Sequence, residues 1–152
     1  RSALQRVLHH PRAAVAVGAV AVLLSAAAVP LFGHIGKLSK VAAGIFYTHN
    51  RIADARLETM AAYAASAGLP QVEVSRLLAA NTTEDALTVL NAAGLRQCVC
   101  QTLAERASIR AERYLFGKLK VGTVMVTLTG ELLGMDETAR EIGERYGWTL
   151  PQ

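Results

Sequence analysis

A run of 24 uncharged residues between Arg12 and Lys37 constrains this chain more than any other feature. The run reads AAVAVGAVAVLLSAAAVPLFGHIG, and its only polar side chains are Ser25 and His34. A helix rises about 1.5 Å per residue, so a helix of this length would cross a bilayer core of roughly 30 Å. The apolar residues surround the helix axis instead of forming one stripe. We therefore predict a transmembrane anchor over residues 13–36.

Two alternatives to the anchor stay open. Many positions are Ala, which contributes little transfer free energy, so the run could be a buried core helix. The basic start RSALQRVLHHPR and the small residues of SAAAVP also fit an unprocessed signal peptide. Pro30 lies near the end of the run, where it predicts a kink or the exit from the membrane.

The charge is divided unevenly along the chain. Residues 1–53 contain six Lys and Arg and no acid, whereas residues 54–152 contain ten bases and twelve acids. A protein that binds nucleic acid would be expected to carry its basic residues on the folded body. We therefore predict no nucleic-acid partner, a basic interfacial segment over residues 1–12, and anionic lipids near Arg6, Arg12, Lys37 and Lys40.

A long amphipathic helix is predicted after the anchor, over residues 35–67. Apolar side chains recur at spacings of three, four and seven residues, at Leu38, Val41, Ile45, Ile52, Met60 and Tyr63. Gly68 and Pro70 predict its end. Because such a stripe must be covered, we name Leu38, Val41, Ile45 and Ile52 as candidates for a partner interface.

Shorter helices are predicted downstream. The pattern Thr82-Thr83-Glu84-Asp85 predicts a capping box between a helix over residues 70–80 and one that ends at Gly94. A helix of about six turns follows over residues 95–116, and Asp136 is predicted to cap the last helix. Residues 69–94 could form a helix-turn-helix, but the acids at the start of its second helix would repel phosphate.

Residues 118–135 are ambiguous. Val and Thr favour a strand, but a single strand in a helical chain would lack a partner, so we predict a helix or a membrane-apposed hairpin. A second membrane crossing is the alternative. On a helix, Gly130 and Gly134 would share one face and allow close approach of another helix. We name both glycines and the single Trp, Trp148, as further interface candidates.

The sequence contains no recognisable catalytic or ligand-binding motif. Cys98 and Cys100 form a C-x-C pair that we interpret as buried thiols on a helix, and the four His residues lack zinc-ligand spacing. No phosphate-binding, dinucleotide-binding or metalloprotease pattern occurs. We therefore predict that the protein is not an enzyme and has no catalytic, cofactor-binding or metal-binding residues.

These observations give an all-α fold: one transmembrane helix, a long amphipathic helix and a small irregular helical bundle. The predicted domains are the interfacial segment 1–12, the anchor 13–36 and a helical accessory domain 37–152. The predicted function is structural support within a multi-subunit complex of the mitochondrial inner membrane, a respiratory complex or an ATP synthase, because the acid-free start resembles a transit peptide. The alternative is a membrane-tethered module whose 69–94 hairpin binds a peptide or nucleic acid.

Overall fold

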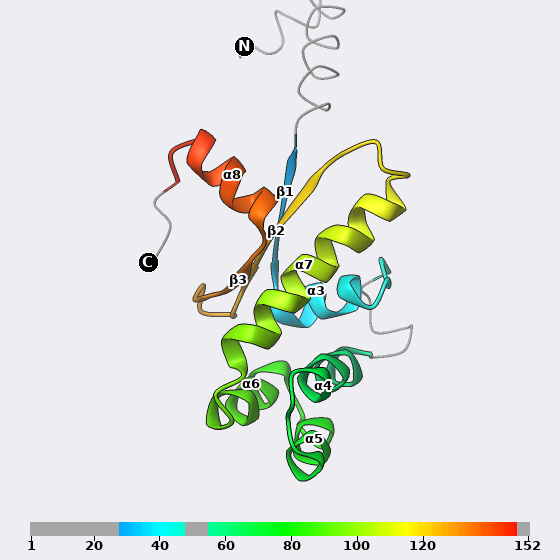
Figure 1. The fold of residues 1–152 in the computed structure, drawn as a ribbon, viewed down its shortest axis with the longest axis vertical. Helices are drawn as coiled ribbons and strands as arrows, with labels where there is room; N and C mark the ends of the chain where they lie inside the picture. The colour runs from blue at the N-terminus through cyan, green and yellow to red at the C-terminus, as the bar shows by residue number, and fades with distance from the viewer. Residues whose placement is uncertain (1–27, 48–54, 149–152) are drawn as a thin grey trace, which may run out of the picture.

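The computed structural model describes residues 28–47 and 55–148. Within these ranges the chain forms three strands and six helices, which Figure 1 shows as one sheet with helices around it. In chain order they are β1 (Val29–His34), α3 (Ile35–Ala42), α4 (Arg56–Ser66), α5 (Gln71–Leu78), α6 (Thr83–Ala92), α7 (Arg96–Tyr114), β2 (Val121–Val126), β3 (Leu132–Met135) and α8 (Glu137–Arg145).

The sheet has the strand order β1-β2-β3, with β2 in the centre. β1 and β2 are parallel, so that Val29 lies beside Val121 and His34 lies beside Val126. β3 runs antiparallel to β2, and the register between them shifts at Met125 and Val126. Because β1 and β2 run the same way, their carboxyl ends meet at one edge of the sheet, next to α6.

Helices cover both faces of the sheet, and two glycines allow them to approach closely. A Cβ placed on Gly134 of β3 would lie 2.6 Å from the carbonyl oxygen of Cys100 in α7. A Cβ on Gly122 of β2 would lie 2.4 Å from the backbone nitrogen of Ala139 in α8. Real Cβ atoms do not approach this closely, so both positions require glycine. α7 and α8 thus sandwich the sheet, while α4, α5 and α6 pack beyond the end of β1 (Figure 1).

Four of the described helices end in the same Schellman motif, and α7 ends in a variant of it. At the end of α6, the amide of Leu95 donates to Leu90 O and that of Gly94 donates to Asn91 O. The residue in the left-handed conformation is glycine in α3, α4, α6 and α8: Gly44, Gly68, Gly94 and Gly147. In α7 this position is Phe116, with φ 55°. The left-handed conformation costs a residue that has a Cβ roughly 1–2 kcal/mol.

Several predictions of helix boundaries are confirmed. Thr82 and Asp85 form the capping box in both directions at the start of α6. Asp136 caps α8 by accepting from the amide of Ala139. The predicted six-turn helix is α7, and Gly68 and Gly94 take the left-handed conformation just after α4 and α6.

The prediction of an all-α fold is wrong, because residues 118–135 contain the paired strands β2 and β3. A strand in this region was expected to lack a partner, but β2 also pairs with β1, which lies inside the stretch assigned to the anchor. Residues 13–27 of that stretch lie outside the described residues, and residues 29–34 form a strand. A short apolar run fits a strand as well as a helix, and periodicity does not distinguish them.

The membrane-crossing part of the predicted fold is likewise not supported. Among residues 28–47 and 55–148, no helix combines the length and apolar character needed to cross a bilayer. The predicted long helix 35–67 is also wrong, since α3 ends at Ala42 and Gly44 follows in the left-handed conformation. The proposed domain limits at residues 12 and 36 stay a prediction.

Candidate functional site

A polar pocket lies at the edge where β1 and β2 end. We call it the strand-end pocket; its volume is about 300 Å³, and it is open to solvent. The carboxyl ends of parallel strands are where open α/β sheets bind ligands. The loop between β2 and β3, the helix α6 and the first turn of α7 supply its walls: Glu84, Leu87, Thr88, Asn91, Arg96, Thr127, Leu128, Thr129 and Glu131.

His34 joins the sheet to this pocket. It is the last residue of β1 and the N-cap of α3, where its Nδ1 accepts a hydrogen bond of 3.1 Å from the amide of Gly36. Its Nε2 lies 2.5 Å from Oε1 of Glu84, in the first turn of α6. Since Nδ1 acts as an acceptor, the ring proton is on Nε2, and His34 donates it to the carboxylate. The contact ties together two segments 50 residues apart.

The carboxylate of Glu84 is held in its charged form. Burial raises its pKa, but hydrogen bonds from the His34 ring, the Thr83 hydroxyl and its own backbone amide outweigh that effect and lower the pKa overall. The position at the amino end of α6 adds to this preference, because the helix dipole attracts negative charge there. The rim of the pocket therefore carries a fixed anion at neutral pH.

An ion pair forms a second part of the pocket wall. Nη2 of Arg96, the first residue of α7, lies 2.7 Å from Oε2 of Glu131, just before β3. Nε of Arg96 is buried and has no hydrogen-bond partner within the described part of the chain. Both side chains also line a neighbouring cavity of about 250 Å³. A guanidinium in such a position can pair with the carboxylate of a ligand in place of its protein partner.

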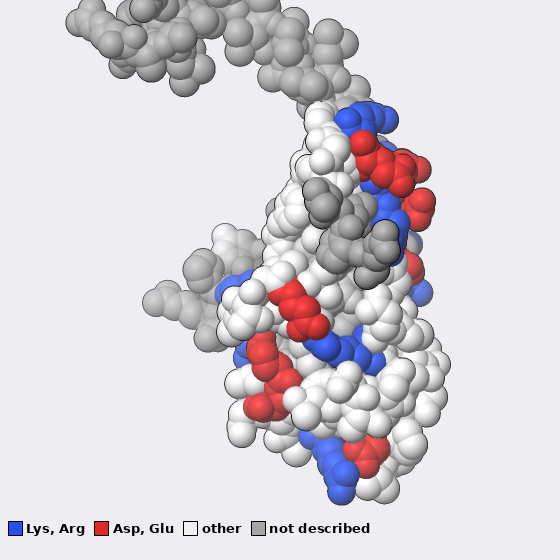
Figure 2. Space-filling model, turned by 90° about the vertical axis from the view of Figure 1, so that its left-hand side faces the viewer, with Lys and Arg blue, Asp and Glu red and all other residues white. Residues whose placement is uncertain are grey.

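Hydroxyl groups fix the loop that closes the pocket. The amide of Glu131 donates to Oγ1 of Thr127, and that of Thr127 donates to the carbonyl of Glu131. The hydroxyls of Thr127 and Thr129 lie 2.9 Å apart. Figure 2 shows basic and acidic side chains interspersed over one face of the molecule.

The arrangement suits binding of a polar ligand more than proton transfer by His34, because both ring nitrogens are already hydrogen-bonded. Among the described residues, no group of three His, Cys, Asp or Glu side chains could hold a metal ion. Only one of the two cysteines fits the predicted buried pair: Cys100 is buried and Cys98 is exposed.

The interface candidates named from the sequence do not gather at one surface. Leu38 and Val41 lie in the chain's own core, and Ile52 lies outside the described residues. Gly130 is in the turn before β3, and Gly134 packs on α7. Ile45 is half-buried, and Trp148 contacts Phe32, with ring centroids 5.2 Å apart. Their role in binding a partner stays a prediction.

The side chains of the strand-end pocket were not identified from the sequence. His34 and Glu84 are 50 residues apart, and Arg96 and Glu131 are 35 apart. No short motif connects such positions. The one available signal was His34, which is one of two polar residues in the apolar run.

Comparisons with known proteins identify relatives over most of the chain. The family model described as "CbiD, C-terminal domain" matches residues 47–137. The cobalt-precorrin-5B C(1)-methyltransferase of Moorella thermoacetica is 46% identical over 120 residues, which are 79% of this chain and 33% of the relative. The protein of the same name from Desulfitobacterium hafniense is 44% identical over 123 residues, 81% of this chain and 31% of the relative. The chain thus spans about a third of these curated relatives.

These findings overturn the predicted function. The relatives are named as methyltransferases, so a non-catalytic accessory subunit of a respiratory or ATP synthase complex is wrong, as is the absence of enzymatic function. The predicted partners are wrong for the same reason. They were other membrane subunits, and anionic lipids near Arg6, Arg12, Lys37 and Lys40. The predicted mitochondrial inner-membrane location is contradicted for the same reason. No solved structure matches the chain significantly.

Proposed function

Because the chain belongs to the CbiD C-terminal domain family, we propose that it is part of a cobalt-precorrin-5B C(1)-methyltransferase and helps to bind the substrate. The observation that carries this proposal is the identity of 46% over 79% of the chain to the Moorella thermoacetica enzyme. The chain covers a third of that enzyme. The proposed role is therefore a contribution to a site that further parts of such an enzyme complete.

The transfer of a methyl group to C1 determines how this part of the enzyme must help to bind the substrate. A bond forms between C1 of the substrate and the methyl carbon, while the bond between the methyl carbon and its donor breaks and leaves its electron pair on the donor. The enzyme has to hold the substrate so that C1 faces the methyl group, because misplacement by about 1 Å slows such a step strongly. Binding groups that hold the substrate away from C1 can supply this orientation.

The strand-end pocket has groups suited to that task. Its volume of about 300 Å³ is at the lower end for ligand pockets, so it would accept one part of the substrate and leave the rest outside. Arg96 would pair with a carboxylate on that part, and the hydroxyls of Thr127 and Thr129 would offer hydrogen bonds. His34 and Glu84 act as positioning residues that fix α6 against the sheet.

A chimera tests the proposal. The full chain replaces the stretch of the Moorella thermoacetica enzyme with which it aligns, and methylation of cobalt-precorrin-5B is followed by mass spectrometry of the product. We expect methylation at C1, and an increase in KM of about tenfold or more when Arg96 is changed to Gln, because a charge-assisted hydrogen bond is lost. A chimera that folds like the parent but forms no methylated product would contradict the proposal.

A further inference from the structure

The face of the sheet under α8 is covered for only part of its width. Residues paired across neighbouring strands place their side chains on the same face, so Phe32 of β1, Val124 of β2 and Met135 of β3 form one row. Val124 and Met135 are buried in a cluster with Ala139 of α8, which places this row on the α8 face. Phe32, at the β1 end of the row, is 56% exposed. Among the described residues, α8 therefore covers the row over β2 and β3 and leaves its β1 end largely in solvent.

The next row toward the strand ends is also only partly covered. It contains Val126 of β2 and Leu132 of β3, which are paired and half-buried. Trp148, which follows α8, packs against the same cluster and contacts the ring of Phe32. We call Phe32, Val126, Leu132 and Trp148 the sheet-face patch. None of these four side chains carries a charge, so a surface that covers the patch has to be apolar.

The position of α8 on the sheet is fixed at its first turn. A Cβ on Gly122 would lie 2.4 Å from the backbone nitrogen of Ala139, so α8 lies directly against the start of β2. Oδ1 of Asp136 accepts from the amide of Thr123 at 2.8 Å and from that of Ala139 at 3.0 Å, which ties the helix to the strand. With nine residues, α8 is only about 13 Å long. The partial cover is therefore a fixed feature of the fold.

The rest of the proposed enzyme is the partner best placed to cover the patch. The chain spans a third of the Moorella thermoacetica relative, and the matched family model is described as a C-terminal domain. Most of such an enzyme therefore precedes this domain. β1 is the first described element, so the preceding part joins the described fold at the strand that carries Phe32. Linkage raises the effective concentration of that part to about the millimolar range, which favours it over a separate copy of the chain.

We propose that the sheet-face patch is the contact surface for an apolar face of the part of the methyltransferase that precedes this domain. The proposal rests on the proposed function, which supplies that part. Exposed apolar patches are typical of such contacts. The patch also borders the strand-end pocket. Val126 directly precedes Thr127 of the pocket lining, and Leu132 directly follows Glu131. The contact thus places the preceding part beside the pocket, where it completes the site.

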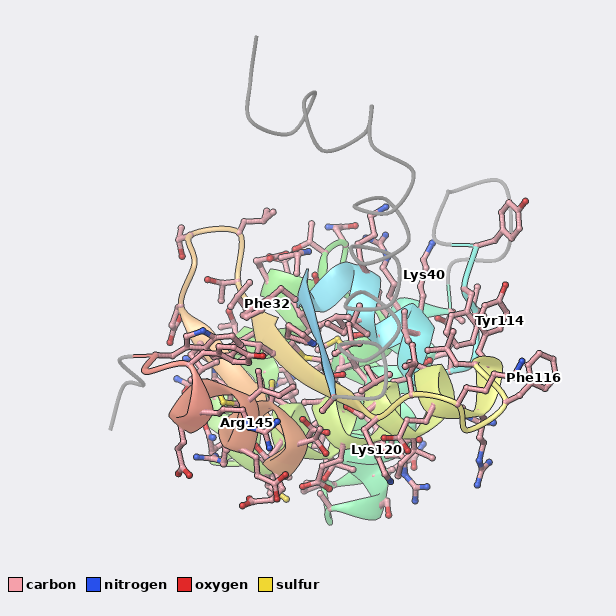
Figure 3. All side chains as sticks on the ribbon, turned by 90° about the horizontal axis from the view of Figure 1, so that it is seen from above. Phe32, Lys40, Tyr114, Phe116, Lys120 and Arg145 are labelled. Carbon is pink, nitrogen blue, oxygen red and sulfur yellow. The ribbon has the colours of Figure 1, made fainter. Side chains whose placement is uncertain are left out.

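Photocrosslinking in the chimera with the Moorella thermoacetica enzyme tests the proposal. p-Benzoylphenylalanine replaces Phe32, and the peptides joined by irradiation are identified by mass spectrometry. We expect position 32 to join to peptides of the preceding, Moorella-derived part of the same chain. The matched control is the same replacement at Phe116, which is 87% exposed and lies on the opposite side of the molecule from Phe32 in Figure 3. We expect position 116 to give no such crosslink.

A second format does not depend on the fusion. The full chain with p-benzoylphenylalanine at position 32 is mixed with the Moorella thermoacetica enzyme that lacks the aligned stretch. We expect the same peptides to be joined, in lower yield because the two parts are no longer linked.

Phe32→Thr measures the burial of the ring. Threonine keeps the strand preference, and the ring is largely exposed in the chain alone, so we expect its melting temperature to fall by about 2 °C at most. We expect a fall of roughly 4 °C or more in the chimera, because a buried aromatic ring is lost there. Phe116→Asn is the control, since asparagine tolerates the left-handed backbone at this position, and it should act equally in both proteins.

Three results would overturn the proposal. The first is a chimera that folds like the parent and gives no crosslink from position 32 to the preceding part. The second is a crosslink that joins two copies of the chimera, which would make the patch a surface between copies. The third is an equal effect of Phe32→Thr in the chimera and in the chain alone.

The contact and the proposed function can fail separately. A chimera that methylates cobalt-precorrin-5B without the crosslink contradicts the contact alone. A chimera that shows the crosslink but forms no methylated product contradicts the proposed function alone.

Discussion

At the scale of single residues, the clearest contrast is between the two thiols of α7. Cys100 is fully buried, and burial raises its pKa to about 12; nearby Arg96 opposes the rise, and Glu131 adds to it. Cys98 is exposed on the same helix. Since the thiolate is the reactive form, Cys100 is protected both by its high pKa and by lack of access.

This contrast predicts the number of thiols that react. The native protein at pH 8 should consume one equivalent of an aromatic disulfide reagent, and the protein in 6 M guanidinium chloride should consume two. Cys98→Ser should abolish the native reaction, whereas Cys100→Ser should leave it. Rapid modification of two thiols in the native protein would mean that α7 opens away from the sheet.

Glu84 predicts how stability depends on pH. Its pKa is lowered in the folded protein from its ordinary value of 4.5, so the unfolded chain binds a proton more readily. Its contribution is therefore complete above the ordinary value and is lost as pH falls through the lower, folded value. Urea unfolding between pH 3 and 7 should show a steeper loss of stability on the acid side for the native sequence than for Glu84→Gln.

The control for this measurement is Glu141→Gln, which removes an exposed carboxylate of α8. It accounts for the change in net charge without touching the contact of Glu84 with His34. If the free energy of unfolding falls equally steeply toward low pH for Glu84→Gln and for the native sequence, this contact contributes nothing to the loss of stability in acid.

At the scale of elements, the contact of β3 with α7 depends on Gly134, because glycine has no side chain. A Cβ on Gly134 would lie 2.6 Å from the carbonyl oxygen and 2.8 Å from the carbonyl carbon of Cys100. Both are backbone atoms, so a strand or a helix has to move to make room. Gly134 thus allows a close approach of two backbones within the chain.

We therefore expect Gly134→Ala to destabilise the fold by about 1–3 kcal/mol, the usual cost of overpacking a core. The shift of the urea midpoint measures it. Gly33→Ala is the matched control in β1: its Cβ would meet the side chain of buried Leu38 at 3.0 Å, and a side chain shifts by a few tenths of an ångström more readily than a backbone does. If Gly134→Ala lowers the stability no more than Gly33→Ala does, the close packing of β3 against α7 is contradicted.

The helices could be predicted from the sequence because their signals are local. Thr82 and Asp136 reach backbone amides three residues away, and Gly68 follows directly on the helix that it ends. The sheet could not be predicted in this way, because β1 finds its partner only after five helices. The site could not be predicted for the same reason. Its two polar pairs, His34 with Glu84 and Arg96 with Glu131, form only when the sheet and the helices have assembled.

At the scale of the whole molecule, the parallel pairing of β1 with β2 joins the first described element to the part of the chain that follows α7. β2 is bonded on both sides: its Thr123 amide donates to Asp136 Oδ1, and the Val29 amide of β1 donates to Lys120 O, just before β2. β1 has only one neighbour among the described strands. The strand that joins the two ends of the described chain is therefore also one of the two edges of the sheet that the described strands form.

Hydrogen exchange at single-residue resolution tests this topology. In a parallel ladder alternate amides of an edge strand face the partner, so the Val29 bond predicts that Leu31 and Gly33 also donate to β2, whereas Phe32 faces away. We expect slow exchange at Leu31 and Gly33 and fast exchange at Phe32, with Leu103 in the centre of α7 as the slowly exchanging reference. Fast exchange at all three β1 residues would contradict the pairing. Slow exchange at Phe32 as well would mean that another segment covers this edge, and the sheet would then extend beyond β1.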